Sequence, residues 1–165
     1  MKALRKYLKR AKELGARDAK IIPADRIYAA GWVRLKCQFG CGGWGARLTC
    51  PPNSPTPEET AKVLKEYRRG VLIHGDDHTD IQGIVATLER EIFLDGFYMA
   101  FGLGAGPCES CSKCSRSCRH PELARPAMEA CGIDVYRTAR SNGFPIEVVR
   151  TYGCKGNYYG LVLVD

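Results

Sequence analysis

Four cysteines near the middle of the chain follow the spacing Cys108-x2-Cys111-x2-Cys114-x3-Cys118. This is the spacing of the cluster loops of bacterial ferredoxins, in which closely spaced thiolates reach separate irons of one four-iron cubane. The fourth thiolate of such a loop commonly binds a different cluster. Four-cysteine zinc sites instead use two pairs, usually separated by about a dozen residues or more. The loop therefore favours an iron–sulfur cluster over zinc.

The segment after this loop departs from the ferredoxin pattern, which has proline directly after its fourth cysteine. Here Arg119 and His120 come first, and Pro121 follows. For this reason we do not expect the architecture of an ordinary ferredoxin. His120 lies two residues beyond a predicted ligand, where a histidine can contact or bind the metal. By default, His74 and His78 are expected to be structural or surface residues.

A second cysteine group, Cys37-x3-Cys41-x8-Cys50, lies in a segment rich in glycine. Glycine lets the backbone approach a cluster closely and donate amide hydrogen bonds to its sulfurs. Radical enzymes that use S-adenosylmethionine would need a further cysteine at position 44, where Trp44 stands, so that function is excluded. Three thiolates do not complete a four-ligand site, and Cys118, displaced from its own loop, is the natural fourth ligand.

The predicted ligands therefore divide between two [4Fe–4S] clusters. The first set is Cys37, Cys41, Cys50 and Cys118. The second set is Cys108, Cys111 and Cys114, completed by Cys154 or by an open position. Cys154 lies between two glycines in a predicted loop, which is typical of a ligand or a reactive thiol. Cys131 falls in a helical stretch and is expected to fill the core.

The cysteine count and the charge point to the same conclusion. The chain has nine cysteines, an odd number, and no secretory signal is visible, so metal binding is favoured over disulfides and a cytoplasmic location is expected. The formal charge of +7 suggests a nucleic-acid partner. A four-thiolate cluster or zinc site carries about −2, so two such sites would lower the charge to about +3. A nucleic-acid partner is therefore not expected.

The remaining pattern predicts one α+β domain over residues 1–165, with a mixed sheet of four or five strands, flanking helices and two cysteine-rich metal loops. Apolar residues form 45% of the chain and charged residues 26%, which excludes disordered and membrane proteins. Helices are expected at 4–14, 57–67, 81–93, 126–131 and 134–141. Strands are expected at 19–22, 71–74, 97–101, 146–150 and 158–164. Residues 31–57 are expected to form an irregular metal loop.

Three glycines, Gly102-x-Gly104-x-Gly106, follow the expected strand 97–101 and resemble a phosphate-binding loop. Their spacing is not that of the dinucleotide fingerprint, and cysteines follow instead of a helix. We therefore expect these glycines to pack the backbone against the cluster.

Several motifs resemble those of a prokaryotic family of predicted metal-binding proteins, domain of unknown function 2284, over nearly the whole chain. They are Arg34-Leu35-Lys36-Cys37, Cys50-Pro51-Pro52-Asn53, Gly104-Ala105-Gly106-Pro107-Cys108, Cys118-Arg119-His120-Pro121-Glu122, Ala124-Arg125-Pro126 and Glu129-Ala130-Cys131-Gly132-Ile133-Asp134-Val135. The resemblance implies metal binding and places seven cysteines, but neither Cys131 nor Cys154, on family motifs. It supplies no reaction. It also implies frequent occurrence in anaerobes, which suits oxygen-sensitive clusters.

Three functions remain open. The first is a redox accessory protein with two [4Fe–4S] clusters, whose basic surface docks an acidic partner such as a flavoprotein. The second is an enzyme in which one cluster has an open iron that binds a sulfur or oxygen atom of a substrate. The third is a zinc-stabilised module that binds nucleic acid or protein, using the basic first helix and, as groups that stack on bases, Trp32, Trp44, Tyr158 and Tyr159.

Overall fold

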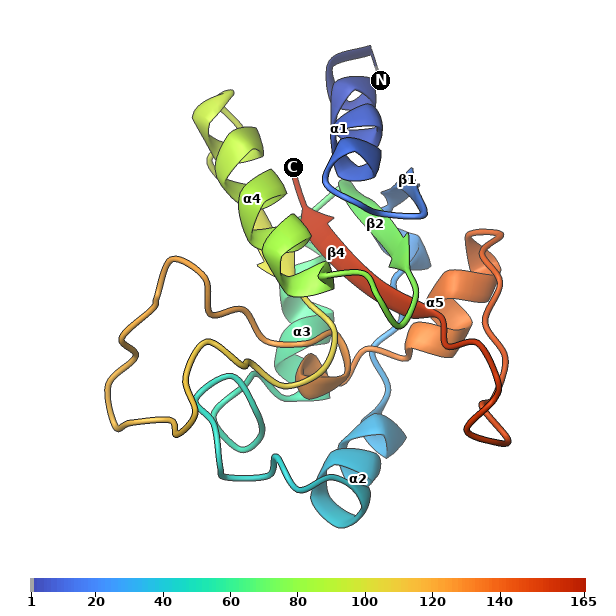
Figure 1. Cartoon of the computed structure of the whole chain (residues 1–165). Coiled ribbons are helices and arrows are strands. Elements are labelled where there is room, and N and C mark those ends of the chain that lie inside the picture. The colour runs from blue at the N-terminus through green and yellow to red at the C-terminus, as the bar shows by residue number, and fades with distance from the viewer. Residues whose placement is uncertain (1) are drawn as a thin grey trace.

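A four-stranded sheet forms the centre of the computed structural model, which describes residues 2–165 and their side chains from residue 4 onward (Figure 1). Its strands, in order across the sheet, are β1 (Asp18–Pro23), β2 (Arg69–Gly75), β4 (Tyr158–Leu163) and β3 (Phe101–Leu103). All neighbouring strands pair antiparallel. The expected α+β fold and strand number are confirmed, and the sheet is antiparallel where a mixed sheet was expected.

Helices cover both faces of this sheet. They are α1 (Lys2–Glu13), α2 (Gly31–Gly40), α3 (Pro57–Leu64), α4 (Ile81–Leu94) and α5 (Val135–Ser141), with short 3-10 turns η1 (Ala24–Arg26) and η2 (Glu129–Cys131). Helix α3 begins with the predicted threonine cap. The Thr56 hydroxyl accepts from the Glu59 amide at 3.2 Å, and the Glu59 carboxylate accepts from the Thr56 amide at 2.7 Å.

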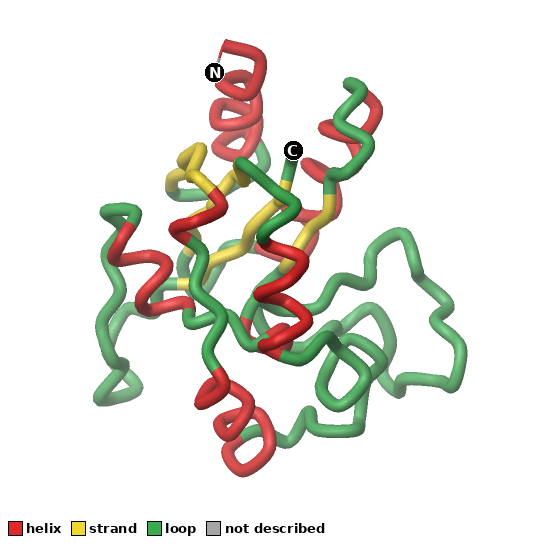
Figure 2. The backbone as a smooth tube through the Cα atoms, turned by 180° about the vertical axis from the view of Figure 1, so that it is seen from behind, coloured by secondary structure: helices red, strands yellow, loops and turns green. Residues whose placement is uncertain are grey.

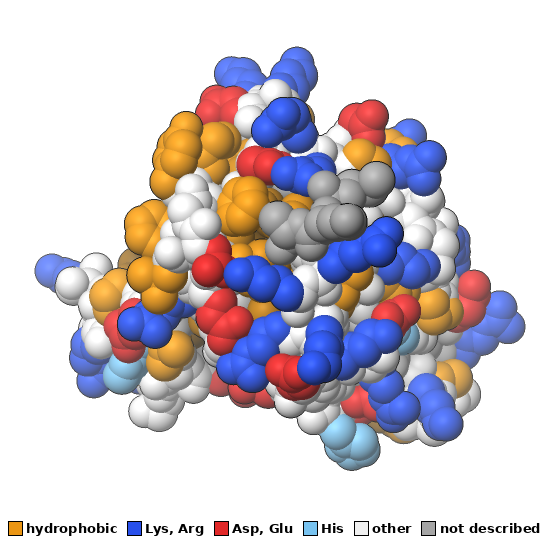
Figure 3. Space-filling model, turned by 90° about the horizontal axis from the view of Figure 1, so that it is seen from above, with side chains coloured by type: hydrophobic (Ala, Val, Ile, Leu, Met, Phe, Trp, Pro, Cys, Tyr) orange, Lys and Arg blue, Asp and Glu red, His pale blue; other side chains and the backbone are white. Residues whose placement is uncertain are grey.

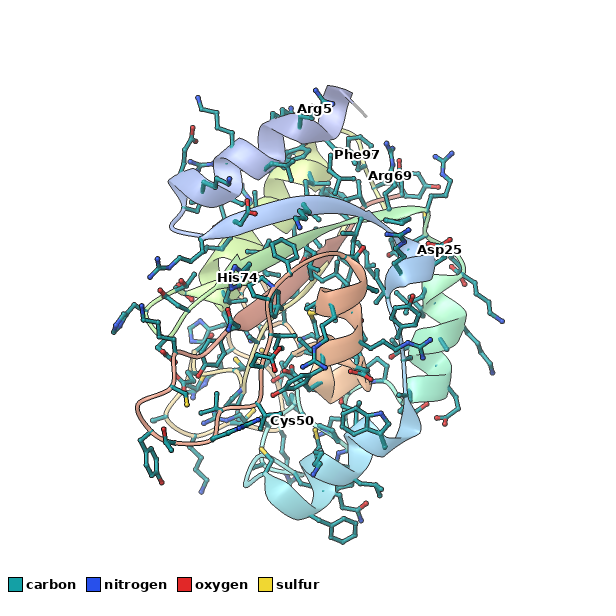
Figure 4. All side chains as sticks on the ribbon, turned by 90° about the vertical axis from the view of Figure 1, so that its right-hand side faces the viewer. Arg5, Asp25, Cys50, Arg69, His74 and Phe97 are labelled. Atoms are coloured by element: carbon teal, nitrogen blue, oxygen red, sulfur yellow. The ribbon has the colours of Figure 1, made fainter. Side chains whose placement is uncertain are left out.

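The two faces of the sheet have separate apolar cores. Helices α1 and α4 pack on the face that carries Val71, Ile73 and Val162. The opposite face carries Leu72 and Leu161 and packs against η2 and α5. Successive residues of β2 and β4 therefore point to opposite sides, as a pleated strand requires. Figure 4 shows α1 and α5 on opposite sides of the strands.

Two expected strands are absent from their predicted positions in the described chain. Residues 146–150 form no strand, because β4 already pairs with β2 on one edge and β3 on the other. The Ile146 carbonyl instead accepts from the Arg140 guanidinium at 3.0 Å. Residues 97–100 form a turn closed by the Ala100 amide on the Phe97 carbonyl, and the strand begins only at Phe101.

The expected loop 31–57 begins instead with helix α2, which carries Cys37 in its last turn. The first helix is confirmed as an amphipathic helix, with Leu4, Tyr7 and Ala11 buried against the sheet. Its basic side chains pair with acids: Lys6 with Asp95 at 2.6 Å, Arg10 with Glu91 at 2.9 Å, and Lys12 with Asp18 at 2.8 Å. Figure 3 accordingly shows Lys and Arg interspersed with Asp and Glu on this face. Within residues 2–165 no helix has both the length and the apolar character to span a bilayer.

Candidate metal centre

The two cysteine-bearing segments lie side by side, although about sixty residues separate them in the chain. Figures 1 and 2 both show the loop after α2 next to the loop after β3. Direct contacts join them. The Leu48 amide points at the Cys114 Sγ at 3.4 Å, and the Arg47 guanidinium donates to the Cys111 carbonyl at 3.4 Å. The tertiary fold thus brings both groups of predicted ligands into one region.

All four thiols of the second group line one small cavity. This four-cysteine site comprises Cys108, Cys111, Cys114 and Cys118, together with residues 47–49 and His120. The cavity volume is about 20 Å³, little more than one water molecule requires. A four-iron cluster would need more room than this cavity offers, and Cys118, one of its lining residues, is exposed.

Hydrogen-bond donors surround these thiols. Besides the Leu48 amide, the buried Thr49 hydroxyl lies at the cavity and has no hydrogen-bond partner among the described residues. Burial raises the pKa of the neighbouring Cys50 thiol, and the Thr49 hydroxyl partly opposes that rise. A buried hydroxyl without a partner costs free energy, and a cluster sulfur would satisfy it.

The first cysteine group forms a second site at the end of α2. Cys37 lies in the last turn of this helix, Cys41 directly follows it, and Cys50 lies in the loop beyond. A Cβ at Gly43 would lie 3.3 Å from the Sγ of Cys50 and 3.4 Å from that of Cys41, so the two thiols flank this glycine. The Gly43 amide also points at the Cys41 Sγ at 3.4 Å. We call these three residues the three-cysteine site.

The thiols of the three-cysteine site affect one another electrostatically. Burial and the neighbouring Cys41 raise the pKa of both Cys37 and Cys50 above the ordinary value for cysteine. Cys108 contributes to the rise at Cys50, so the two sites adjoin. Cysteines must lose their protons to bind metal, and a bound cation supplies the positive charge that this grouping of thiolates requires.

The donor set fits an iron–sulfur cluster by its chemistry. Soft thiolates, with amide and hydroxyl donors directed at their sulfurs, are the ligands and neighbours that such clusters use. In the part of the chain that the structure describes, no three His, Cys, Asp or Glu side chains are placed to hold a single metal ion. The thiols line cavities instead of converging on one point.

A family model described as "Predicted metal-binding protein (DUF2284)" matches residues 20–164. The chain belongs to this family. All nine cysteines lie within the matched residues. No curated protein and no solved structure matches the chain. The family therefore supports metal binding, and the choice of metal rests on the donor chemistry above.

In this DUF2284 protein, the structure groups the predicted ligands differently from the sequence. Cys118 lies with its own loop at the four-cysteine site and does not line the cavity that the three-cysteine site borders. Cys154 lies exposed in the loop before β4, where its sulfur contacts the Thr151 hydroxyl at 3.4 Å. Cys131 is confirmed as a core residue, and burial raises the pKa of its thiol to about 12.

The histidines and glycines of the DUF2284 chain have identifiable neighbours. His74 stacks on Tyr159 with ring centroids 5.0 Å apart, and His78 is exposed, so both are structural or surface residues as expected. The prediction that the glycine run packs against a cluster is wrong for Gly102, which packs against α4 instead. A Cβ at Gly102 would lie 2.5 Å from Val85, so only glycine allows β3 to approach this helix so closely.

Sequence reasoning missed two groups at these sites. Arg47 and Thr49 lie between the cysteine groups, and neither residue type forms a ligand motif. Their position within three residues before Cys50 was the one available signal, because groups that donate hydrogen bonds to a metal ligand often neighbour that ligand in the chain.

Proposed function

We propose that this chain is an iron–sulfur protein that carries [4Fe–4S] clusters at the four-cysteine site and the three-cysteine site and transfers single electrons to a partner protein. The observation that carries the proposal is the common cavity shared by Cys108, Cys111, Cys114 and Cys118. Four thiolates within eleven residues supply the complete ligand set of one cubane. When bound, such a cluster supplies reversible one-electron transfer.

The residues around the four-cysteine site would tune this chemistry. The Leu48 amide donates toward the Cys114 sulfur, and the unpartnered Thr49 hydroxyl would be available to a cluster sulfur, which would spread the negative charge of the thiolates. The Arg47 guanidinium holds the backbone of the loop at Cys111 and adds positive charge between the two sites. Both effects favour the reduced, more negative state and raise the reduction potential.

The adjacency of the two sites supports electron transfer between them. Cys50 of one site and Cys108 of the other lie close enough to interact electrostatically. An electron entering at the exposed loop could therefore pass to the second site without leaving the domain.

The surface of the four-cysteine loop supports an acidic redox partner. Lys113, Arg116 and Arg119 are exposed on this loop, and none forms an ion pair with another described side chain. Two acids, Glu109 and Glu122, lie nearby in sequence, so the surface is basic but not uniformly so. Complementary charge would speed association with a negatively charged partner such as a flavoprotein.

The first test is metal analysis of protein purified without oxygen. Two cubanes predict about eight irons and about eight acid-labile sulfides per chain. A folded protein free of iron and sulfide, or one holding stoichiometric zinc, would contradict the proposal.

The second test measures electron transfer to an acidic flavodoxin at increasing salt. The rate should fall as salt rises, because screening weakens the attraction between the basic loop and the flavodoxin. Arg119→Glu should slow transfer at low salt. Arg90→Glu, an equal charge change at an exposed position of α4, is the matched control. Equal effects of both variants would exclude the loop as the docking surface.

A further inference from the structure

The thiols of the three-cysteine site lie on the wall of a cavity of about 560 Å³. This volume is in the range of cavities that enclose small organic ligands. Helix α2 forms one wall, the segment 146–149 forms another, and the end of β4 closes the base. The cavity that all four thiols of the four-cysteine site line is only about 20 Å³, and of these four residues Cys108 alone also lines a larger cavity, of about 670 Å³, beside Asp76 and Asp80.

The lining of this cavity is mainly apolar and aromatic. Its lining includes Trp32, Trp44, Tyr136, Ile146 and Val149. The guanidinium of Arg34 lies over the Trp44 ring, 5.5 Å from its centroid, and supports that wall. Burial of an aromatic or branched body against such side chains is favourable.

The wall formed by segment 146–149 is anchored to the fold. The Tyr159 hydroxyl, on β4, donates to the Pro145 carbonyl. The Arg140 guanidinium, on α5, donates to the Ile146 carbonyl at 3.0 Å. Two elements of the core therefore hold this segment beside the cavity, which makes the cavity a preformed site.

No fourth cysteine reaches this cavity. Cys118 and Cys108 line the four-cysteine site, and Cys154 is exposed in the loop before β4. The polar side chains at the cavity include Lys36, Glu129 and Glu147. Three thiolates would bind three irons of a cubane, which would leave one iron without a cysteine ligand beside this cavity.

We propose that the three-cysteine site is a ligand-binding cluster site, and that its cavity takes a small organic thiol with an aromatic or branched apolar body. This inference rests on the proposed function, because it requires a cluster at Cys37, Cys41 and Cys50. The body of the ligand packs between Trp32 and Val149, and its sulfur, which loses its proton to solvent, binds the iron as a thiolate and completes the ligand set. Sulfur is the expected donor because a thiolate-ligated iron site favours soft ligands.

The test uses the full chain, loaded with both clusters without oxygen, then reduced and measured by paramagnetic resonance. The probes are benzyl mercaptan, 2-mercaptoethanol as a thiol without an apolar body, and phenylacetate as an oxygen donor of similar shape. Benzyl mercaptan should shift one of the two cluster signals at a concentration at least about tenfold below that needed for either other probe.

Variants locate the binding site. Trp32→Ala should raise the benzyl mercaptan concentration needed for the shift about tenfold, with the iron content unchanged. Phe39→Ala removes an exposed aromatic ring from the same helix outside the cavity, and it should leave the shift unchanged. Cys154→Ser should change neither the iron content nor the thiol shift.

Several results would overturn the inference. These are equal responses to all three probes, no response to any of them, a response to phenylacetate alone, or equal effects of Trp32→Ala and Phe39→Ala. Loss of iron or a newly acquired thiol response in Cys154→Ser would show that Cys154 closes the site. An iron content that is about four in the unaltered protein and stays the same in Cys50→Ser would overturn this inference and leave the four-cysteine cluster in place. Absence of iron from the unaltered protein would overturn both proposals.

Discussion

The four-cysteine site and the three-cysteine site offer the same ligand atoms in different surroundings. The four thiols of the first lie on one short, exposed loop around a cavity of about 20 Å³. The three thiols of the second come from a helix end and a loop, and they border a cavity of about 560 Å³. The contrast indicates that ligand chemistry alone does not assign a role. The space beside a cluster decides whether it can only exchange electrons or can also bind a small molecule that enters from solution.

The side chains around the two sites also differ in charge. Basic side chains of the four-cysteine loop project from the surface, where they can meet another protein. The three-cysteine site faces aromatic and aliphatic side chains, where a charged protein surface has little to contact. We therefore expect electrons to enter at the first site and a ligand to bind at the second.

The largest expected effect is the loss of iron when a cysteine of either site is replaced by serine. Cys114→Ser and Cys50→Ser should each remove about half of the iron and abolish a different paramagnetic signal of the reduced protein, because each removes a ligand from one cluster. Iron analysis and paramagnetic resonance of protein prepared without oxygen measure both. If either substitution removed all the iron, the two sites would not be independent and the comparison would fail.

Arg47 lies between the sites, so its removal should affect both. Arg47→Ala should lower the reduction potentials by about 60 mV, the one-electron equivalent of a tenfold change in equilibrium constant, because a positive charge stabilises the reduced cluster. Redox titration followed by paramagnetic resonance is the measurement. Arg47→Lys keeps the positive charge, so its reduction potentials should stay close to those of the unaltered protein. Unchanged potentials in Arg47→Ala would show that this guanidinium acts only as a structural contact to Cys111.

Substitution of Cys131 tests whether this buried cysteine is a core residue or a metal ligand. Cys131→Ala should leave the iron content unchanged and lower the free energy of unfolding by about 1 kcal/mol, because it deletes one buried atom from a packed core. Denaturant unfolding of the metal-free chain and iron analysis of the loaded chain measure the two effects. Lower iron content would identify Cys131 as a ligand and contradict its assignment to the core.

The smallest expected effect concerns Cys154, the thiol that joins neither site. Its contact with the Thr151 hydroxyl lowers the pKa of the Cys154 thiol below its ordinary value. The thiolate is therefore present at lower pH than in an ordinary cysteine, and alkylation by iodoacetamide should begin at correspondingly lower pH. Thr151→Val removes the hydrogen bond and should move the alkylation profile to higher pH. A profile that does not move would exclude this contact in solution.

Local signals predicted several elements correctly for identifiable reasons. The helix at 57–64 has its cap, proline and first-turn acids within four residues, and interactions of this range survive in any tertiary context. The helix at 81–94 has a long apolar period, and its Asp80 cap is adjacent in sequence. Residues 146–150 have a strand-like composition, but whether they pair depends on an edge of β4 that other strands occupy.

The sequence by itself determined that this chain carries closely spaced thiols suited to metal, because cysteine spacing is local and the ligand chemistry belongs to the residue type. It also indicated that Cys131 would fill the core, since Cys131 lies within an apolar stretch, whereas the burial of Cys50 came from the tertiary structure. Only the tertiary structure decided that Cys118 stays with its own loop, that the Leu48 amide points at a cysteine sulfur, and that Cys37, Cys41 and Cys50 line a cavity. Those outcomes depend on how distant segments pack around the sheet, and no short-range pattern encodes that packing.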